Sequence, residues 1–202
     1  MQKTDLSKEQ KQYYRAKAAP ELITVSAANY ITVEGAGDPA TGRFKAKIKA
    51  LYAVAYNIKK INKLQDQDFK VAALEGLWWA ESGEPVTERP REEWHWKLQI
   101  QMPAFVAKND FKQAVALAGN RNPAHLHELQ WEAQPAVLAA QILHTGSYDA
   151  ETPTLQKLDE YIRQHNLEVT GAHHEIYLSD PTKTAAEKLK TILRFDVKSS
   201  KI

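Results

Sequence analysis

A spaced motif that occurs twice limits most strongly what this chain can fold into. The pattern G-x-x-D-x-x-T spans residues 35–41 and recurs at residues 146–152. Each copy follows an apolar segment with the alternation of a strand. Each copy also precedes a segment whose apolar residues recur every three or four positions, as in an amphipathic helix. Repetition of a whole element order indicates internal duplication. The alternative is that the motif occurs twice by chance, because glycine and aspartate favour turns by themselves.

The two copies predict two similar modules, each with the order strand-helix-strand-strand. We expect the first module over about residues 22–102, a linker over 103–134 and the second module over about 135–198, all within one domain of residues 1–202. The expected elements are strands at 22–34, 69–79 and 94–102 with a helix at 42–61, then strands at 135–145, 173–178 and 191–198 with a helix at 152–165.

This element order predicts an α+β fold with an antiparallel sheet. A module with one helix for three strands covers only one face of its sheet, so two modules must pack together. The simplest arrangement relates them by a pseudo-twofold axis. Ligand pockets favour the interfaces between modules, so we expect the ligand site in a cleft between the two.

Composition excludes several classes of protein. The 202 residues include no cysteine, which excludes a disulfide scaffold and a thiolate metal site. The formal net charge is +2 with scattered lysines, which gives no electrostatic footprint for nucleic-acid binding. No apolar run approaches the length of a membrane span, and the polar N-terminus lacks a signal core. We therefore expect a cytoplasmic protein that uses no membrane.

The strand expected at residues 173–178, HHEIYL, carries the candidate chemistry. Alternation places His173, Glu175 and Tyr177 on one face and leaves Ile176 on the opposite, core-facing side. A glutamate is rare in the middle of a short strand. It lies either on a solvated sheet face or in a functional site, where partial burial would raise its pKa and make it a better general base.

Aromatic residues are concentrated near the expected cleft. Four of the five tryptophans lie between residues 78 and 96. Trp96 and Trp79 are candidate ligand contacts, because flat rings stack on planar ligands, and ordinary core packing is the alternative for each. Tyr148 is a further candidate at the cleft edge. Glu75 is a ligand-binding or structural partner related to Glu175 by the repeat.

Nucleotide-binding, zinc-protease and serine-hydrolase motifs are missing from the sequence. His125 and His127 lack a third ligand in view, and we expect ordinary surface residues there rather than a zinc site. His144 and His173 are expected to be structural histidines. We predict no metal and no cofactor.

Several segments together resemble a known family. They are LITVSAANYITVEGAGDP, LEGLWW, W-x-W-K-L-x-I-x-x-P-x-F-V at residues 94–106, A-x-Q-I-L-H-T-G-S-Y-D-x-E-x-x-T, HHEIYLSDP and EKLKTILR. In this order they are similar to GyrI-like small-molecule-binding proteins over about residues 20–198. The resemblance implies the tandem strand-helix-strand-strand fold. It also places the family's central acidic residue at Glu175 and its aromatic lining at Trp96, Trp79 and Tyr177.

The resemblance leaves three functions open. Stand-alone relatives are described as hydrolases of cyclopropane-bearing DNA-alkylating compounds, which would make Glu175 a general base. Other relatives are the effector-binding halves of multidrug-responsive regulators, which implies a non-catalytic site for aromatic or lipophilic cationic ligands. A gyrase-inhibitory relative implies a protein-interaction surface. Only about 20 residues precede the first expected strand, too few for a helix-turn-helix, so we expect no direct DNA binding. No pattern predicts an oligomeric state.

Overall fold

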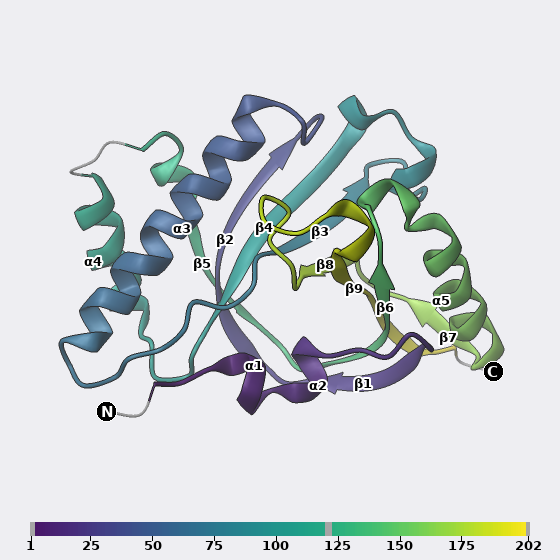
Figure 1. Cartoon of the computed structure of the whole chain (residues 1–202), viewed down its shortest axis with the longest axis horizontal. Helices are drawn as coiled ribbons and strands as arrows, with labels where there is room; N and C mark the ends of the chain where they lie inside the picture. The colour runs from purple at the N-terminus through teal and green to yellow at the C-terminus, as the bar shows by residue number, and fades with distance from the viewer. Residues whose placement is uncertain (1–2, 120–122, 201–202) are drawn as a thin grey trace.

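Nine strands form one curled sheet in the computed structural model, which describes residues 3–119 and 123–200 (Figure 1). The strands are β1 (Glu21–Val25), β2 (Ala28–Ala36), β3 (Glu75–Ala80), β4 (Trp94–Met102), β5 (Gln130–Gln134), β6 (Val137–Thr145), β7 (Leu167–Val169), β8 (His173–Tyr177) and β9 (Lys190–Ser199). The helices are α1 (Leu6–Glu9), α2 (Lys11–Tyr14), α3 (Gly42–Lys63), α4 (Lys108–Gly119) and α5 (Thr152–Gln164). The predicted α+β class is confirmed.

The order of strands across the sheet is β1-β6-β9-β8-β3-β4-β2-β5, with β7 added on β9. Every pair is antiparallel, as the sequence predicted. The pair β8–β3 lies at the centre, with β6 and β9 on one side and β4 and β2 on the other. This palindromic order is the one that two strand-helix-strand-strand modules related by a twofold axis would produce.

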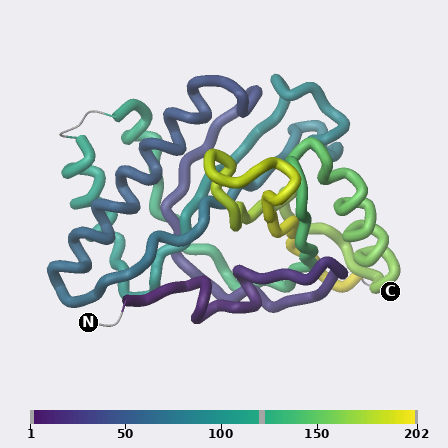
Figure 2. Tube along the Cα trace, viewed as in Figure 1, coloured from purple at the N-terminus to yellow at the C-terminus, as the bar shows by residue number. Residues whose placement is uncertain are grey.

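Helices α3 and α5 cover the same face of the sheet at its two ends (Figure 1). The apolar stripe of α3, which includes Leu51 and Ile58, packs on Ile31 and Leu98 of the first module's strands. In the second module Leu158 of α5 packs on strands β6 and β9. Seen from the direction of Figures 1 and 2, the loop from β8 to β9, residues 178–189, appears between these two helices (Figure 2). The opposite face of the sheet is covered by α1 and α2.

Several elements differ from those expected. The expected strand 22–34 is two strands, because β1 pairs with β6 while β2 pairs with β4 and β5. The expected strand 69–79 begins only at Glu75, and residues 70–74 run as extended chain outside the ladder. The expected linker contains α4 and also β5, which extends the sheet beyond β2; its residues 120–122 lie outside the described residues. No helix in the described ranges combines the length and apolar character required to cross a membrane.

The twofold relation of the modules stays a prediction. We expect residues 22–102 and 135–198 to superimpose as two similar halves, because both the motif spacing and the strand order repeat. An experimentally determined structure checks this by least-squares superposition of the two Cα traces. Halves whose helices pack on opposite faces of their strands would contradict internal duplication.

Candidate active site in the cleft between the modules

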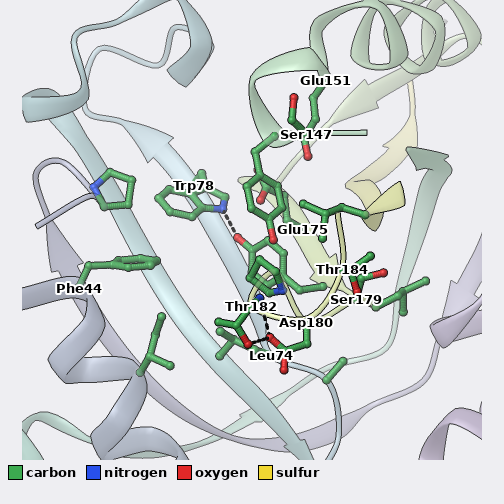
Figure 3. Close-up of a pocket in the computed structure, with 18 of the residues that line it drawn as sticks. Phe44, Leu74, Trp78, Ser147, Glu151, Glu175, Ser179, Asp180, Thr182 and Thr184 are labelled. Atoms are coloured by element: carbon green, nitrogen blue, oxygen red, sulfur yellow. Dashed lines mark hydrogen bonds between the residues drawn. The ribbon is translucent and has the colours of Figure 1, made fainter. Parts of the chain in front are cut away.

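A cleft of about 1450 Å³ lies between the two modules, on the face of the sheet that carries α3 and α5 (Figure 3). Its lining combines residues of α3, β3 and the loop 84–94 with residues of the turn 147–151, strand β8 and the loop 178–189. Residues near the N-terminus, including Asp5 and Tyr14, close one end. The cleft is therefore formed by segments that are far apart in the sequence.

The first module supplies an aromatic wall of Phe44, Trp78 and Trp94. The Phe44 and Trp78 rings are stacked with centroids 5.8 Å apart. The Trp78 and Trp94 rings meet edge to face, also at 5.8 Å. These contacts fix the rings in one arrangement, so the wall presents a rigid apolar surface that suits a flat ligand.

The second module supplies two tyrosines on the other side. Tyr148 and Tyr177 pack edge to face with centroids 5.7 Å apart. The indole Nε1–H of Trp78 donates a hydrogen bond of 3.2 Å to the hydroxyl of Tyr177, which ties the two walls together at the central strands (Figure 3). Both tyrosines were predicted as ligand contacts from the sequence, and both line the cleft.

Pairing between the modules decides which side chains of β3 face the cleft. Gly76 of β3 lies opposite Glu175 of β8, and Trp78 lies opposite His173. Residues opposite one another in an antiparallel pair point to the same face. Gly76 also provides necessary space, because a Cβ built there would lie 2.7 Å from the Tyr177 hydroxyl.

Glu175 lies in the cleft and is hydrogen-bonded to His173. His173 Nε2 lies 3.1 Å from Glu175 Oε1, and the side chains are only 8% and 12% exposed. Burial, and then the charge of Glu175, hold the pKa of the Tyr177 phenol far above its usual range. Glu175 is thus a largely buried carboxylate held in one orientation by an imidazole.

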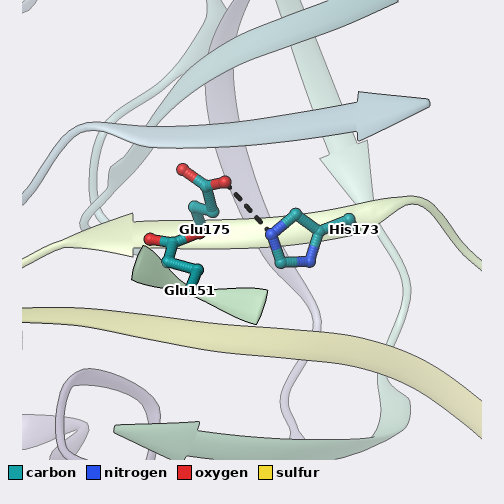
Figure 4. A group of neighbouring side chains, drawn as sticks. All are labelled: Glu151, His173 and Glu175. Carbon is teal, nitrogen blue, oxygen red and sulfur yellow. Dashed lines mark hydrogen bonds and ion pairs between the residues drawn. The ribbon is translucent and has the colours of Figure 1, made fainter. Parts of the chain in front are cut away.

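Glu151 is a second buried carboxyl beside Glu175 (Figure 4). It immediately precedes α5, is 5% exposed, and its Oε1 has no hydrogen-bond partner among the described residues. Burial, and then the charges of Glu175 and Asp149, raise the pKa of Glu151 to about 9. At neutral pH Glu151 therefore carries a proton, which it can share with Glu175. Glu151, which was not predicted as a site residue, therefore joins Glu175 as a second titratable group of the cleft.

Glu151, His173 and Glu175 form a compact cluster. Their donor atoms all lie within 4.8 Å of one another, close enough to share either a proton or a divalent cation. The hydrogen bond between His173 and Glu175 and the proton held by Glu151 favour acid–base chemistry.

Three predicted site residues lie away from the cleft. Trp96 is 1% exposed and packs in the first module's core, where its indole N–H donates to the Gly37 carbonyl at 3.2 Å. Trp79 points to the opposite face of the sheet and stacks on His95. Glu75 is also on that face and is completely buried. The repeat correctly placed Trp79 and Glu75 on one face, but it could not show that the cleft lies on the other.

Sequence reasoning missed Glu151, Trp78, Trp94 and Phe44 as cleft residues. Glu151 occupies an unspecified position of the repeated motif, where the first copy has Ala40, and all unspecified positions differ between the copies. The repeat therefore gave no signal for Glu151. The choice of Trp78 over Trp79 has no signal in the sequence either.

Comparison with known proteins supports the same fold. A conserved protein of Listeria innocua described as uncharacterized superimposes with a TM-score of 0.89 at 34% identity, covering 97% of this chain and 100% of that chain. A Listeria innocua protein described as a hydrolase gives a TM-score of 0.85 at 32% identity, covering 97% and 100%. The EcmrR C-terminal domain, at 13% identity and a TM-score of 0.56 over 89% and 97% of the chains, shares the fold. No curated protein matches the sequence.

The sequence also matches a family model directly. The match runs over residues 18–198, which includes both modules and every cleft residue discussed above except the N-terminal Asp5 and Tyr14. The chain therefore belongs to the family of GyrI-like small-molecule-binding domains.

Proposed function

We propose that this protein binds a flat, largely apolar aromatic compound in the cleft and hydrolyses an activated small ring, such as a cyclopropane, on that compound. The observation that supports catalysis is the arrangement of Glu175: a largely buried carboxylate, oriented by His173, beside a rigid aromatic wall. The relatives described as hydrolases, at 32% identity over nearly the whole chain, support the same proposal.

In this mechanism the aromatic wall binds the flat part of the substrate and holds the ring next to Glu175. Glu175 accepts a proton from a water molecule, and the water oxygen attacks the ring carbon. The carbon–carbon bond of the strained ring breaks, and its electron pair is delocalised into the attached aromatic system. That system then takes the proton held by Glu175, which completes the addition of water and regenerates the carboxylate. The hydrogen bond from His173 keeps the carboxylate aimed at the water, which removes part of the entropic cost of reaction.

A second candidate function is binding without turnover. Glu175 together with Tyr148, Tyr177 and Trp78 forms a carboxylate within an aromatic enclosure, which attracts lipophilic cations by charge and by cation–π interaction. The two functions differ in one observable. A hydrolase returns its ligand heavier by one water molecule, whereas a binding protein returns it unchanged.

Mass spectrometry of a planar aromatic compound that carries an activated cyclopropane separates the two functions. We expect the wild-type protein to convert the compound to its water adduct. The proposed reaction uses no metal, so the rate should be unchanged after treatment with EDTA. Tight binding with complete recovery of unchanged compound would contradict the hydrolase and support the binding protein.

Tyr148→Ala should weaken ligand binding. Tyr148 is 40% exposed and lines the cleft, so its ring is free to contact the ligand. Loss of one aromatic contact costs about 1–2 kcal/mol, roughly a 5- to 30-fold rise in Kd. Quenching of tryptophan fluorescence during titration measures this Kd, because Trp78 and Trp94 line the same cleft.

Trp79→Leu is the matched control for this titration. Trp79 lies on the other face of the sheet, so its removal should leave the Kd unchanged within about twofold. An equal loss of affinity in both variants would show that the ligand does not occupy this cleft.

A further inference from the structure

The cleft contains two neighbouring carboxyl groups, and the ring-opening reaction uses only one of them as a base. Glu151 and Glu175 come from the turn before α5 and from β8, yet they lie side by side (Figure 4), with carboxyl oxygens within 4.8 Å of one another. Both are largely shielded from water, and both line the cleft. Neighbouring carboxyl groups shielded from water repel one another when both are ionised, so Glu151 keeps its proton at neutral pH.

This geometry suits one class of reaction better than another. Opening of a small ring by direct displacement places the attacking water and the breaking bond on opposite sides of the carbon, so adjacent carboxyl groups cannot assist both. Addition of water to a carbonyl is different, because the attacking oxygen and the carbonyl oxygen become neighbours on the same carbon. A pair with one proton can then remove a proton from the water and deliver another to the carbonyl oxygen, as paired carboxyl groups do in aspartic proteases.

We propose that the Glu151–Glu175 pair gives the cleft a further activity, the hydrolysis of activated esters of flat aromatic alcohols. The aromatic wall of Phe44, Trp78 and Trp94 would bind the aryl group. The proposal shares the cleft and Glu175 with the proposed function, but it does not depend on ring opening.

Each proton transferred in this reaction is returned by its end. Glu175 takes a proton from water as the carbon–oxygen bond forms, and Glu151 gives its proton to the carbonyl oxygen. The resulting tetrahedral intermediate collapses when one of its hydroxyl groups returns a proton to Glu151. The bond to the aryl oxygen breaks at this step, and the leaving oxygen takes the proton held by Glu175. The products are a carboxylic acid and a phenol, and both carboxyl groups regain their starting states.

Groups around the pair support this assignment. Burial, and then the charges of Glu175 and Asp149, disfavour ionisation of Glu151. Arg91, which also lines the cleft, forms an ion pair with Asp149 at 2.9 Å. The pKa values of Tyr148 and Tyr177 are raised by burial and by the charge of Glu175, which keeps both phenols neutral while the pair functions. His173 is hydrogen-bonded to Glu175 on the side of that carboxylate that faces away from Glu151 (Figure 4).

The test uses 1-naphthyl acetate, a flat aryl ester, with the full-length protein. We expect hydrolysis by the wild-type protein that is lost in Glu151→Gln and in Glu175→Gln, each by about 10²–10⁴-fold in kcat. The double variant should be no worse than either single variant, because the two groups act as a unit. Wild-type kcat should fall above about pH 9, where Glu151 loses its proton.

Glu160→Gln is the matched control, because Glu160 is an exposed glutamate on α5; its rate should equal that of the wild type. Circular dichroism of each variant confirms folding. A wild-type rate no higher than that of the double variant would overturn the proposal, as would full activity of Glu151→Gln or a rate that keeps rising above pH 9. Ring opening without ester hydrolysis would remove only this proposal, and ester hydrolysis without ring opening would remove only the proposed function.

Discussion

Glu75→Ala should lower the free energy of unfolding by about 3–5 kcal/mol. Glu75 is fully buried on the face of the sheet opposite the cleft. Its Oε2 accepts hydrogen bonds from the Tyr13 hydroxyl at 2.7 Å, the Gln99 amide at 2.8 Å and His174 Nε2 at 2.9 Å. Removing the carboxylate leaves these three buried donors without their shared acceptor, and each unpaired donor adds a desolvation cost.

Urea denaturation at neutral pH measures this loss. Glu168→Ala is the matched control, because Glu168 forms an exposed ion pair with Lys198 and such pairs contribute at most about 1 kcal/mol. The double variant Glu75→Ala/His174→Ala should be less destabilised than the sum of its single variants, because each single variant already breaks the same contact. A change in Glu75→Ala no larger than that in the control would contradict the buried network.

The same network connects the N-terminal segment to the central strands. Tyr13 of α2 reaches Glu75 of β3, and Arg194 of β9 donates to the Tyr13 carbonyl at 2.6 Å. His174 lies between His173 and Glu175 in β8, with its side chain on the opposite face. The network therefore holds β8, the strand that carries Glu175, from the face of the sheet opposite the cleft.

Much of the fold could be predicted from local patterns. The strict alternation of residues 94–102 predicts a strand, and the structure has β4 over the same residues. The repeated motif correctly predicts the starts of two helices, at Gly42 and Thr152. These predictions succeed because alternation and helical periodicity depend only on neighbouring residues.

Features that depend on distant pairing could not be predicted. The cleft-facing side of β3 is set by its register with β8, which comes from the other module, so Trp78 rather than Trp79 enters the cleft. Strand β5 has little apolar alternation and forms because β2 offers it a free edge. The proximity of Glu151 and Glu175 requires the turn before α5 to lie near β8, and no local pattern encodes that approach.

Within the site, the face carried by β8 was predictable and its chemistry was only partly so. Alternation placed His173, Glu175 and Tyr177 together, and the structure has all three in the cleft. A single strand cannot reveal a second carboxyl that arrives from elsewhere in the chain. For this reason Glu151, the protonated member of the pair, is identifiable only from the structure.

Glu175→Gln should abolish most turnover while leaving binding nearly intact. Glutamine keeps the shape of the side chain and an oxygen that accepts the hydrogen bond from His173, but it cannot take a proton from water. A general base contributes about 10²–10⁴-fold in rate. The Kd of the aromatic compound, measured by tryptophan quenching, should change by no more than about threefold, because the aromatic walls are unaltered.

Single-turnover conversion of the cyclopropane-bearing compound by wild type, Glu175→Gln and the control Glu160→Gln is the most direct measurement of the central claim. The variants are compared at saturating protein, so that differences in affinity do not enter the rate. We predict equal rates for wild type and Glu160→Gln, and a rate about 10²–10⁴-fold lower for Glu175→Gln with the same amount of compound bound. Turnover by Glu175→Gln at the wild-type rate would contradict the assignment of Glu175 as the general base of this cleft.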